Sequence, residues 1–258
     1  MLDVSLSEFG AIRPQRRGLA FGVDSTRPQL YSLRQARYQA LAFDIQRMAA
    51  EYVHLGRPLR LLDIGVNDGI SRKYLNAWPS SANIDFYGAD LDELDVHERE
   101  KWTGFWTGDF MEGYPDIPSG FFDVVICEQV LEHLPELETA VRTLQRVLRP
   151  GGTLFVGVPI FPHGFHLLRR PVVAVMDGMQ TNPRQRGHVQ AFSLITFKGL
   201  LRRYTTLEIR EARGFRVISG GVLRPLENRR WWWRFNRWLG SKVPGACIEV
   251  QIIARKPV

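Results

Sequence analysis

The stretch from Leu59 to Leu75, LRLLDIGVNDGISRKYL, constrains the fold of this chain more than any other part of the sequence. Its apolar run, Leu59–Ile64, lies between a proline and a glycine and is typical of a short strand buried on both faces. A glycine-bearing turn, Gly65–Gly69, follows, and Ser71–Trp78 is predicted to be a helix. Strand, glycine turn and helix form the first half of a nucleotide-binding unit, because glycine permits close backbone approach and a helix N-terminus offers unpaired N–H groups.

The turn differs from the dinucleotide-binding fingerprint G-x-G-x-x-G, since Asn67 and Asp68 come soon after Gly65. It therefore lacks the crowding of glycines that a pyrophosphate requires. The strand that leads into it also carries an acid, Asp63, near its end. This combination favours a ligand with a cationic or hydroxylated portion over a ligand rich in phosphate.

Strand and helix signals alternate from residue 59 to residue 160. Further strands are predicted at Ile84–Leu91, Phe105–Met111, Phe121–Glu128 and Thr153–Ile160. A helix over Leu137–Leu148 is ended by the sequence Pro-Gly-Gly. This alternation indicates an α/β fold, with a mostly parallel sheet covered by helices on both faces.

An acid, Asp90, ends the second predicted strand, 21 residues after Gly69. Such an acid is well placed to accept hydrogen bonds from the hydroxyls of a ribose. The alternative is that Asp90 caps the N-terminus of a following helix, which is a common use of aspartate at a strand end.

Three local sequences carry a resemblance to a known family: DIGVNDG at residues 63–69, FFDVVICEQVLEHL at residues 121–134 and LRPGGTLFVGVP at residues 148–159. Together they resemble the class I S-adenosylmethionine-dependent methyltransferases, in the branch called methyltransferase type 11. The chain departs from that family's G-x-G-x-G at Asn67, which stands where the middle glycine is usual. The resemblance implies a seven-stranded sheet of order 3-2-1-4-5-7-6 with strand 7 antiparallel.

The resemblance also implies S-adenosylmethionine as the cofactor. In the family, the second strand's acid binds the ribose, an acid followed by an apolar residue binds the adenine, and the turn after the fourth strand lies near the methionine. The positions that match these parts and are predicted to bind the cofactor are Asp63, Gly65, Asn67, Gly69, Asp90, Leu91, Asp109, Phe110, Glu128 and Gln129.

Methyl transfer to a hydroxyl needs a base, and histidine has the most suitable unperturbed pKa for that task. We predict His188 as the first candidate, His133 as the second and His163 as the third. Each of them has a structural alternative as a hydrogen-bonded histidine without a catalytic role. No metal site is predicted, and the two cysteines, Cys127 and Cys247, are interpreted as buried thiols in a reducing compartment.

The chain divides into an N-terminal arm and helix, residues 1–56, packed on a methyltransferase domain, residues 57–258. The helix is predicted over Leu33–Val53, with a capping box at Ser32. Within the domain, residues 161–192 are predicted to form a lid over the cofactor. Ser193 is predicted to cap a following helix, and strands at Thr206–Glu211 and Cys247–Ala254 form the closing hairpin.

A basic, tryptophan-rich insert, residues 214–246, separates the last two strands. As a helix it groups Trp231, Trp232, Phe235, Trp238 and Leu239 on one side and Arg230, Arg234 and Arg237 on the other, with Trp233 near the flank. Residues 184–258 hold 16 Lys and Arg against 4 Asp and Glu, a balance of +12, which indicates an acidic partner or a solvated basic surface. The insert fits a helix in a membrane interface and, equally, a helix docked on the core or on a second subunit. Binding of single-stranded nucleic acid comes third.

From these features we predict O-methylation of a saccharide hydroxyl on a lipid-linked glycan or lipopolysaccharide (O-antigen) precursor. The alternatives are a small hydrophobic, quinone-like metabolite, RNA, and a non-catalytic cofactor-binding scaffold. No apolar run reaches the roughly 18 to 20 residues that span a bilayer, and no signal peptide is recognised. The predicted location is the cytoplasm, with peripheral binding at the inner face of the membrane, and a homodimer is an open alternative.

Overall fold

A computed structural model describes residues 33–165, 167, 187–217 and 221–258 of the chain. Its centre is a seven-stranded sheet of order β3-β2-β1-β4-β5-β7-β6, which confirms the predicted order. Neighbouring strands are parallel except that β7 is antiparallel to both β5 and β6. The strands are β1 Leu59–Ile64, β2 Ile84–Asp90, β3 Gly104–Thr107, β4 Phe122–Glu128, β5 Leu148–Pro159, β6 Glu208–Phe215 and β7 Glu249–Arg255.

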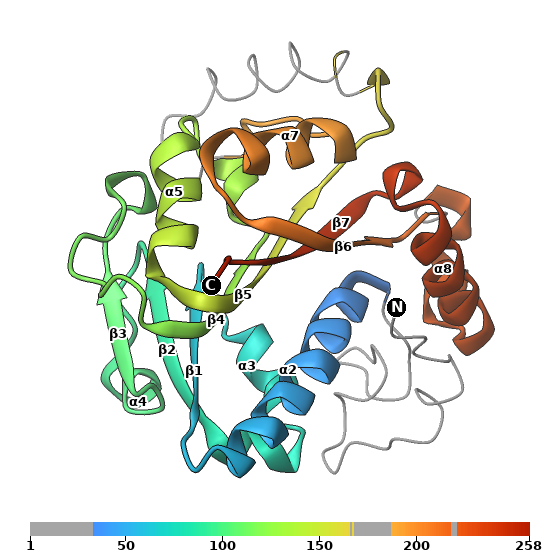
Figure 1. The fold of residues 1–258 in the computed structure, drawn as a ribbon. Helices are drawn as coiled ribbons and strands as arrows, with labels where there is room; N and C mark the ends of the chain where they lie inside the picture. Colours follow the sequence, from blue (N-terminus) through green and yellow to red (C-terminus); the bar gives the residue numbers. More distant parts are fainter. Residues whose placement is uncertain (1–32, 166, 168–186, 218–220) are drawn as a thin grey trace.

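Helices cover both faces of this sheet, as the alternating sequence pattern predicted (Figure 1). The α-helices are α2 Ala36–His54, α3 Ile70–Leu75, α4 Val96–Arg99, α5 Glu138–Val147, α7 Leu194–Tyr204 and α8 Arg230–Lys242. The 3₁₀ turns are η1 Leu33–Gln35, η2 Pro79–Asn83, η3 Phe110–Glu112, η4 Leu131–His133, η6 Gly221–Asn228 and η7 Pro244–Ala246.

The first helix after the glycine turn, α3, is shorter than the sequence predicted. It ends at Leu75, whereas the prediction continued to Trp78. Trp78 precedes Pro79 and has an extended backbone, with φ −105° and ψ 140°. A residue before proline is driven out of the helical region by the proline ring, so the helix has to end before it.

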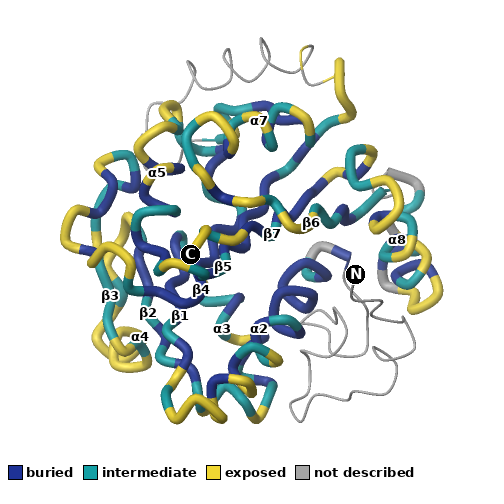
Figure 2. Tube along the Cα trace, in the orientation of Figure 1, coloured by how far each residue is buried: buried dark blue, intermediate teal, exposed yellow. Residues whose placement is uncertain are grey.

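The strands alternate their side chains between two apolar cores. In β1, Leu62 and Ile64 join the core that packs against α5 and α7, whereas Leu59 and Leu61 join the core that packs against α2 and α3. Both sets are buried, and the central strands are the most deeply buried part of the molecule (Figure 2). The continuous apolar run of β1 is therefore explained by a strand with cores on both sides.

Helix α2 packs against α3 and the turn η2. Its buried side chains are part of the core on that face of the sheet. It begins with Gln35 as its N-cap, without a side-chain capping hydrogen bond. The predicted capping residue, Ser32, lies outside the described residues, as does the rest of the N-terminal arm. Most of the predicted lid, residues 168–186 and residue 166, also lies outside them, so both segments stay predictions.

The insert between β6 and β7 forms η6, α8 and η7, and α8 packs against β6. The predicted division of its faces was wrong for two residues. Trp233, placed on the flank, is only 2% exposed, and Arg237, placed on the polar side, lies with its guanidinium 4.5 Å from the centre of the Phe215 ring. The helix can approach so closely because Gly240 meets Gly214, where a Cβ atom on Gly240 would lie 2.1 Å from the Gly214 carbonyl oxygen.

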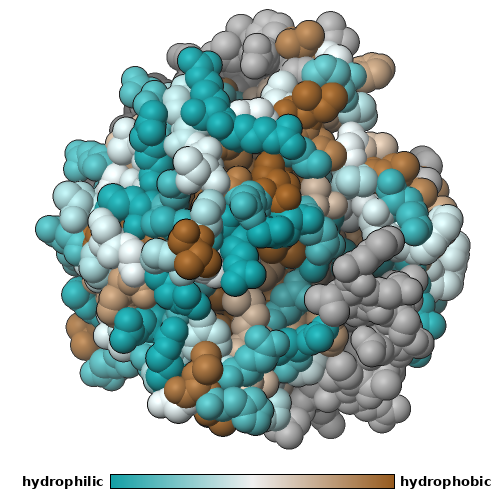
Figure 3. Space-filling view, viewed as in Figure 1, coloured by the Kyte–Doolittle hydropathy of each residue, from teal (hydrophilic) through white to brown (hydrophobic). Residues whose placement is uncertain are grey.

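The outer side of α8 keeps three aromatic side chains in solvent. Trp231, Phe235 and Trp238 are 60%, 37% and 48% exposed. Elsewhere, the face seen in Figure 3 is largely hydrophilic, with its apolar side chains in several separate spots. Among the helices of the described residues, none combines the length and the apolar character needed to cross a bilayer.

The amino end of β4 carries a buried ionic cluster. Asp123 accepts two hydrogen bonds of 2.8 Å from the Arg57 guanidinium, one of 2.9 Å from the Tyr52 hydroxyl and one of 2.9 Å from the Arg60 backbone N–H. Arg149 donates a fifth through Nε. Burial alone would raise the pKa of Asp123, but these hydrogen bonds outweigh it and hold the pKa well below its usual value. Through these contacts the cluster links four parts of the chain to one another: α2, the loop before β1, β4 and β5.

Candidate functional site

Two adjoining cavities open at the carboxyl ends of the central strands, where β1 and β4 lead to helices on opposite faces of the sheet. This is the position at which open parallel sheets bind ligands. One cavity, of about 500 Å³, is lined by residues that include Asp90, Leu91, Asp109 and Tyr114, and we call it the β2-side cavity. The other, of about 440 Å³, is lined by residues that include Gln35, Arg37, Glu128 and Glu132, and we call it the α2-side cavity. Four residues line both of them: Gly65, Asn67, Gln129 and His133.

The glycine turn after β1 forms the wall that the two cavities share. Gly65 has φ 78°, and a Cβ atom there would lie 2.3 Å from a methyl group of Val130, so glycine is required for two reasons. Asn67 has φ 46°, a left-handed conformation that asparagine adopts more readily than most residues. The turn therefore keeps its shape although Asn67 stands at a position where the family usually has glycine.

Asp90 links this turn to the end of β2. Its carboxylate accepts hydrogen bonds of 2.7 Å from the backbone N–H groups of Asn67 and Leu91. Each carboxylate oxygen can accept a further hydrogen bond, and Asp90 lines the β2-side cavity. The side chain thus stabilises the turn and still presents acceptors to a ligand, rather than capping a helix.

The far wall of the β2-side cavity comes from the segment after β3. Asp109 accepts a hydrogen bond of 2.8 Å from the Met111 N–H, and Phe110 stacks on Tyr114 with 5.7 Å between ring centres. Together with Leu91, which is 44% exposed, these rings give the cavity an apolar portion beside its two carboxylates. Tyr114 was not predicted from the sequence, and no local pattern marks it.

Two of the predicted cofactor residues do not line either cavity. Asp63 is buried beneath the turn, where Ser71 donates a hydrogen bond to it, and burial raises the pKa of its carboxyl well above the usual value. Gly69 is the N-cap of α3 with φ 67°. Both residues shape the turn from below, so any effect on a ligand passes through the backbone of Gly65 and Asn67.

The α2-side cavity is lined largely by polar side chains, and Glu128, at the end of β4, is one of the buried ones. Gln251 donates a hydrogen bond of 2.8 Å to it, and Arg37 Nε lies 3.3 Å away. Burial raises the pKa of Glu128 to about 7 even though Arg37 favours the ionised form. Gly157 on β5 makes room for this carboxylate, because a Cβ atom there would lie 2.2 Å from Glu128 Oε2.

The next residue, Gln129, has a strained backbone. Its φ is 60°, which is uncommon for a residue with a long side chain, and its N–H donates to the Gly157 carbonyl at 2.8 Å. Such strain is found most often at functional sites, and Gln129 lies between the two cavities. The strain turns the chain sharply after β4 and directs the following turn, η4, toward the cavity wall.

The structure brings two of the three predicted histidines together with a residue that the sequence analysis missed. Glu132, His133 and His188 place one possible ligand atom each within 4.8 Å of one another. Glu132 is fully buried, and burial raises its pKa to about 8. The signal that could have revealed it is a charged residue inside the otherwise apolar run VLEHL.

The third candidate, His163, lies elsewhere. Its Nδ1 is 3.0 Å from the hydroxyl of Ser193, and His163 lines neither cavity. Ser193 caps α7 as predicted, and it forms a reciprocal capping box with Thr196. The surroundings of His163 are thus those of a residue that supports a helix start.

Comparisons with known proteins show what the chain resembles in sequence and in fold. Residues 62–156 match the sequence model of the family described as "Methyltransferase domain". The chain is 26% identical over 152 residues to the ubiquinone biosynthesis O-methyltransferase of Pectobacterium atrosepticum, covering 52% of this chain and 63% of that protein. It is 33% identical over 102 residues to the enzyme of the same name from Methylococcus capsulatus, covering 37% and 41%. The matches thus span less than two thirds of these relatives.

Solved structures resemble the chain in fold. A sarcosine dimethylglycine methyltransferase structure from Galdieria sulphuraria has a TM-score of 0.53 at 14% identity, covering 83% of this chain and 86% of that one. The [4+2]-cyclase SpnF has a TM-score of 0.50 at 18% identity, covering 83% and 80%. At these identities the likeness concerns the fold alone, and the cyclase shows that the fold carries more than one activity.

Proposed function

Because the chain carries a methyltransferase domain on the class I S-adenosylmethionine-dependent methyltransferase fold, we propose that it is an O-methyltransferase that uses S-adenosylmethionine. The observation that carries this proposal is the wall shared by the two cavities. There the carboxylate of Asp90 and the turn at Gly65 and Asn67 face one cavity, and a cluster of histidine and glutamate faces the other. One side fits a nucleoside, and the other fits an acceptor that has to lose a proton.

The residues present fit the cofactor. Asp90 has acceptors for two ribose hydroxyls, and Leu91 and Phe110 offer apolar surface for the adenine beside the carboxylate of Asp109. The absence of a side chain at Gly65 leaves room for close approach of a ligand. The methionine end would then reach toward Gln129 and Glu128 in the α2-side cavity.

When bound, this cofactor supplies an electrophilic methyl group on a sulfonium sulfur. The chain's own residues hold the acceptor in line with it and take part in removing the hydroxyl proton. Both His133 and His188 line the α2-side cavity, which supports them as the residues that would accept that proton. With the cofactor held by these residues, transfer would replace the carbon–sulfur bond by a carbon–oxygen bond and would leave a methyl ether and a neutral thioether.

For the acceptor, we favour a hydroxyl on a small quinone-like ring, the alternative predicted from the sequence. The relatives named ubiquinone biosynthesis O-methyltransferase support it. The saccharide acceptor is the second candidate, and the polar side chains around the α2-side cavity, including Gln35, Arg37 and Asp68, favour it. RNA and a non-catalytic scaffold are the outcomes that the experiment below has to exclude.

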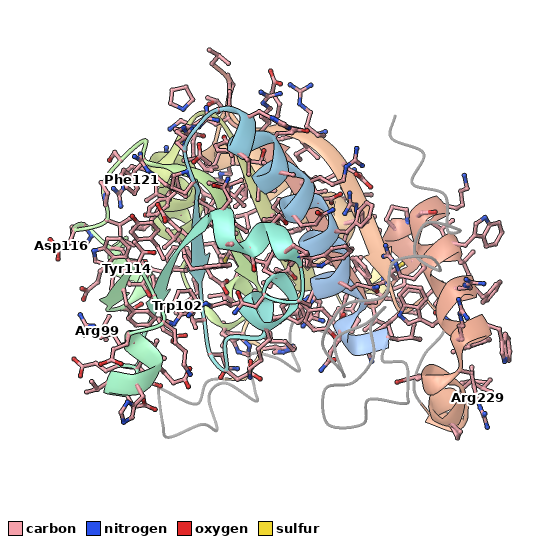
Figure 4. The ribbon with its side chains drawn as sticks, turned by 90° about the horizontal axis from the view of Figure 1, so that it is seen from below. Arg99, Trp102, Tyr114, Asp116, Phe121 and Arg229 are labelled. Atoms are coloured by element: carbon pink, nitrogen blue, oxygen red, sulfur yellow. The ribbon has the colours of Figure 1, made fainter. Side chains whose placement is uncertain are left out.

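The same proposal includes binding to an anionic membrane surface through α8. Trp231, Phe235 and Trp238 are exposed on one side of the helix, and exposed Arg229 and Arg230 lie at its start. Helix α8 lies at the opposite side of the molecule from Tyr114 and its cavity (Figure 4), so a bound membrane would leave the nucleoside side open. Sedimentation with liposomes of neutral and anionic lipid tests this, and a dimer in solution would assign the aromatic residues to a subunit contact instead.

Isothermal titration with S-adenosylmethionine tests the function directly, followed by transfer of labelled methyl groups to a panel of phenols, saccharides and RNA. Binding and transfer to a phenol support the favoured acceptor, and transfer to a saccharide or RNA replaces it. Binding without transfer to any acceptor would support the scaffold, and absence of binding would refute the proposal.

A further inference from the structure

Glu132 is a buried carboxyl group in the wall of the α2-side cavity. The residue is 0% exposed and lines the α2-side cavity, yet neither oxygen accepts a hydrogen bond from another described residue. Leaving a buried carboxylate unpaired is costly, so such a group calls for a ligand that the protein alone does not supply.

The nearest arginine does not neutralise it. Arg37 forms ion pairs with Glu249 at 2.8 Å and with Glu128 at 3.3 Å, and Arg216 forms a second ion pair with Glu249 at 2.6 Å. Within the described residues, the basic group nearest to Glu132 is His133, whose Nε2 lies 3.9 Å from Oε1. Arg37 is thus engaged with two other carboxylates, and a positive ligand in the cavity would supply a partner that Glu132 lacks among the described residues.

His133 is oriented so that its second ring nitrogen faces Glu132. Its Nδ1 lies 3.1 Å from the carbonyl oxygen of Gly187, and because a carbonyl only accepts, Nδ1 carries the hydrogen. In the neutral ring, Nε2 then has the lone pair and points toward Glu132. A backbone carbonyl that fixes the tautomer in this way is the usual support of a metal-binding histidine.

His188 is brought to the same place by backbone hydrogen bonds. The carbonyl of Glu132 accepts from the N–H groups of Val189 and Gln190 at 2.8 and 3.1 Å, and the Gln190 side chain donates to the Leu134 carbonyl at 2.8 Å. These bonds hold the segment that follows His188 against η4. The rings of His133 and His188 then meet edge to face, with 5.0 Å between their centres.

We propose that Glu132, His133 and His188 bind one divalent first-row transition cation, with open coordination positions facing the α2-side cavity. Two imidazoles and one carboxylate are a ligand set of catalytic sites for such ions. Their ligand atoms lie within 4.8 Å of one another, and around an ion with bonds of about 2.1 Å they would draw together to roughly 3 to 3.5 Å.

This inference deepens the proposed function and rests on it for the role of the ion. An acceptor hydroxyl bound at an open position becomes more acidic, as water does on such ions, and loses its proton to solvent before its oxygen takes the methyl group. The two histidines then act as ligands rather than as the base. The proposed site departs from the prediction from the sequence, which was that no metal is bound.

Manganese binding tests the site without any activity measurement. The full-length protein is treated with a chelator and dialysed, and Mn²⁺ is titrated while its free EPR signal is followed. We expect one ion per chain, at least about 100-fold weaker binding in Glu132→Gln and His188→Ala, and unchanged binding in the matched surface variants Glu51→Gln and His97→Ala. Because His188 is exposed, its variant keeps the test valid if Glu132→Gln does not fold.

Absence of Mn²⁺ binding to the wild type overturns the inference, and so does binding that persists in both site variants. Titration of S-adenosylmethionine into the chelated protein separates this result from the proposed function. If the cofactor binds and Mn²⁺ does not, the inference alone fails. If the cofactor does not bind, the proposed function fails, and the Mn²⁺ titration still decides the site.

Discussion

The two ends of β4 hold buried carboxylates in opposite circumstances. Asp123, near the amino end, accepts five hydrogen bonds from four residues, whereas Glu132, just past the carboxyl end, accepts none from another described residue. Hydrogen bonds outweigh burial and hold the pKa of Asp123 below its usual value, while burial raises the pKa of Glu132 to about 8. A paired carboxylate stabilises the fold, and an unpaired one marks the site that a ligand has to complete.

The largest expected effect follows from changing the unpaired carboxylate. We expect Glu132→Gln to lower kcat/KM by roughly 10²- to 10⁴-fold, because a ligand or proton-handling group is lost. Its free energy of unfolding should be unchanged or higher, since an amide stays neutral, whereas the buried carboxyl, its pKa raised to about 8, still ionises in part around neutral pH. Initial rates measure kcat/KM, and thermal melting measures stability. A melting temperature that falls along with the rate would contradict the expected difference between Glu132 and Asp123.

Replacing Asp123, the paired carboxylate, should lower the stability of the protein and leave its activity unchanged. We expect Asp123→Asn to lower the free energy of unfolding by about 3 kcal/mol, because Arg57 and Arg149 lose their partner. Folded protein at low temperature should keep its kcat/KM. Chemical denaturation and initial rates check this, and a variant as stable as the wild type would show that the cluster contributes little.

Asp90 is an intermediate case, with two backbone hydrogen bonds and acceptors left over for a ligand. We expect Asp90→Ala to weaken S-adenosylmethionine binding by about 1.5 to 3 kcal/mol, roughly 10- to 150-fold in Kd. Asp90→Asn is the matched control, since it keeps one oxygen and should lose less. Calorimetry measures both, and equal affinity in all three proteins would remove Asp90 from the cofactor site.

The free energy of unfolding should depend on pH through Asp123. The pKa of Asp123 is lowered in the folded state, so its contribution is present above the unfolded pKa of about 3.9 and is lost as the pH falls through and below that value. We expect the wild type to lose about 1.4 kcal/mol per pH unit from this group in that range. Asp123→Asn should show a flatter acid limb, and parallel curves for the two proteins would contradict the assignment.

The smallest effect is expected on the outer side of α8, where the aromatic residues have solvent on one side. Replacing Trp231 or Trp238 by serine should change the free energy of unfolding by no more than about 0.5 kcal/mol, because both are about half exposed. The same variants should sediment less with anionic liposomes. A large drop in melting temperature would show that these residues support the fold as Trp233 does.

The resemblance to class I methyltransferases predicted the sheet order, whereas the glycine turn after the first strand could be predicted from local signals. Apolar runs, glycines and strand-end acids stand close together in the chain, so the wall formed by Gly65, Asn67 and Asp90 could be located from the sequence alone. The faces of α8 could not, because helical periodicity separates polar from apolar residues but does not say which aromatic residues meet the sheet. The close contact between Gly214 and Gly240 determines which side of α8 faces the sheet.

Local signals placed the strand, turn and helix of residues 59–75, and the resemblance to class I methyltransferases supplied the fold around them. Only folding could show which residues meet in the α2-side cavity. Glu132 and His188 lie 56 residues apart, and backbone hydrogen bonds between η4 and residues 189–190 bring them together. Pairing of that kind leaves no periodic trace in a sequence, and whether a buried carboxylate is satisfied depends on every element packed around it.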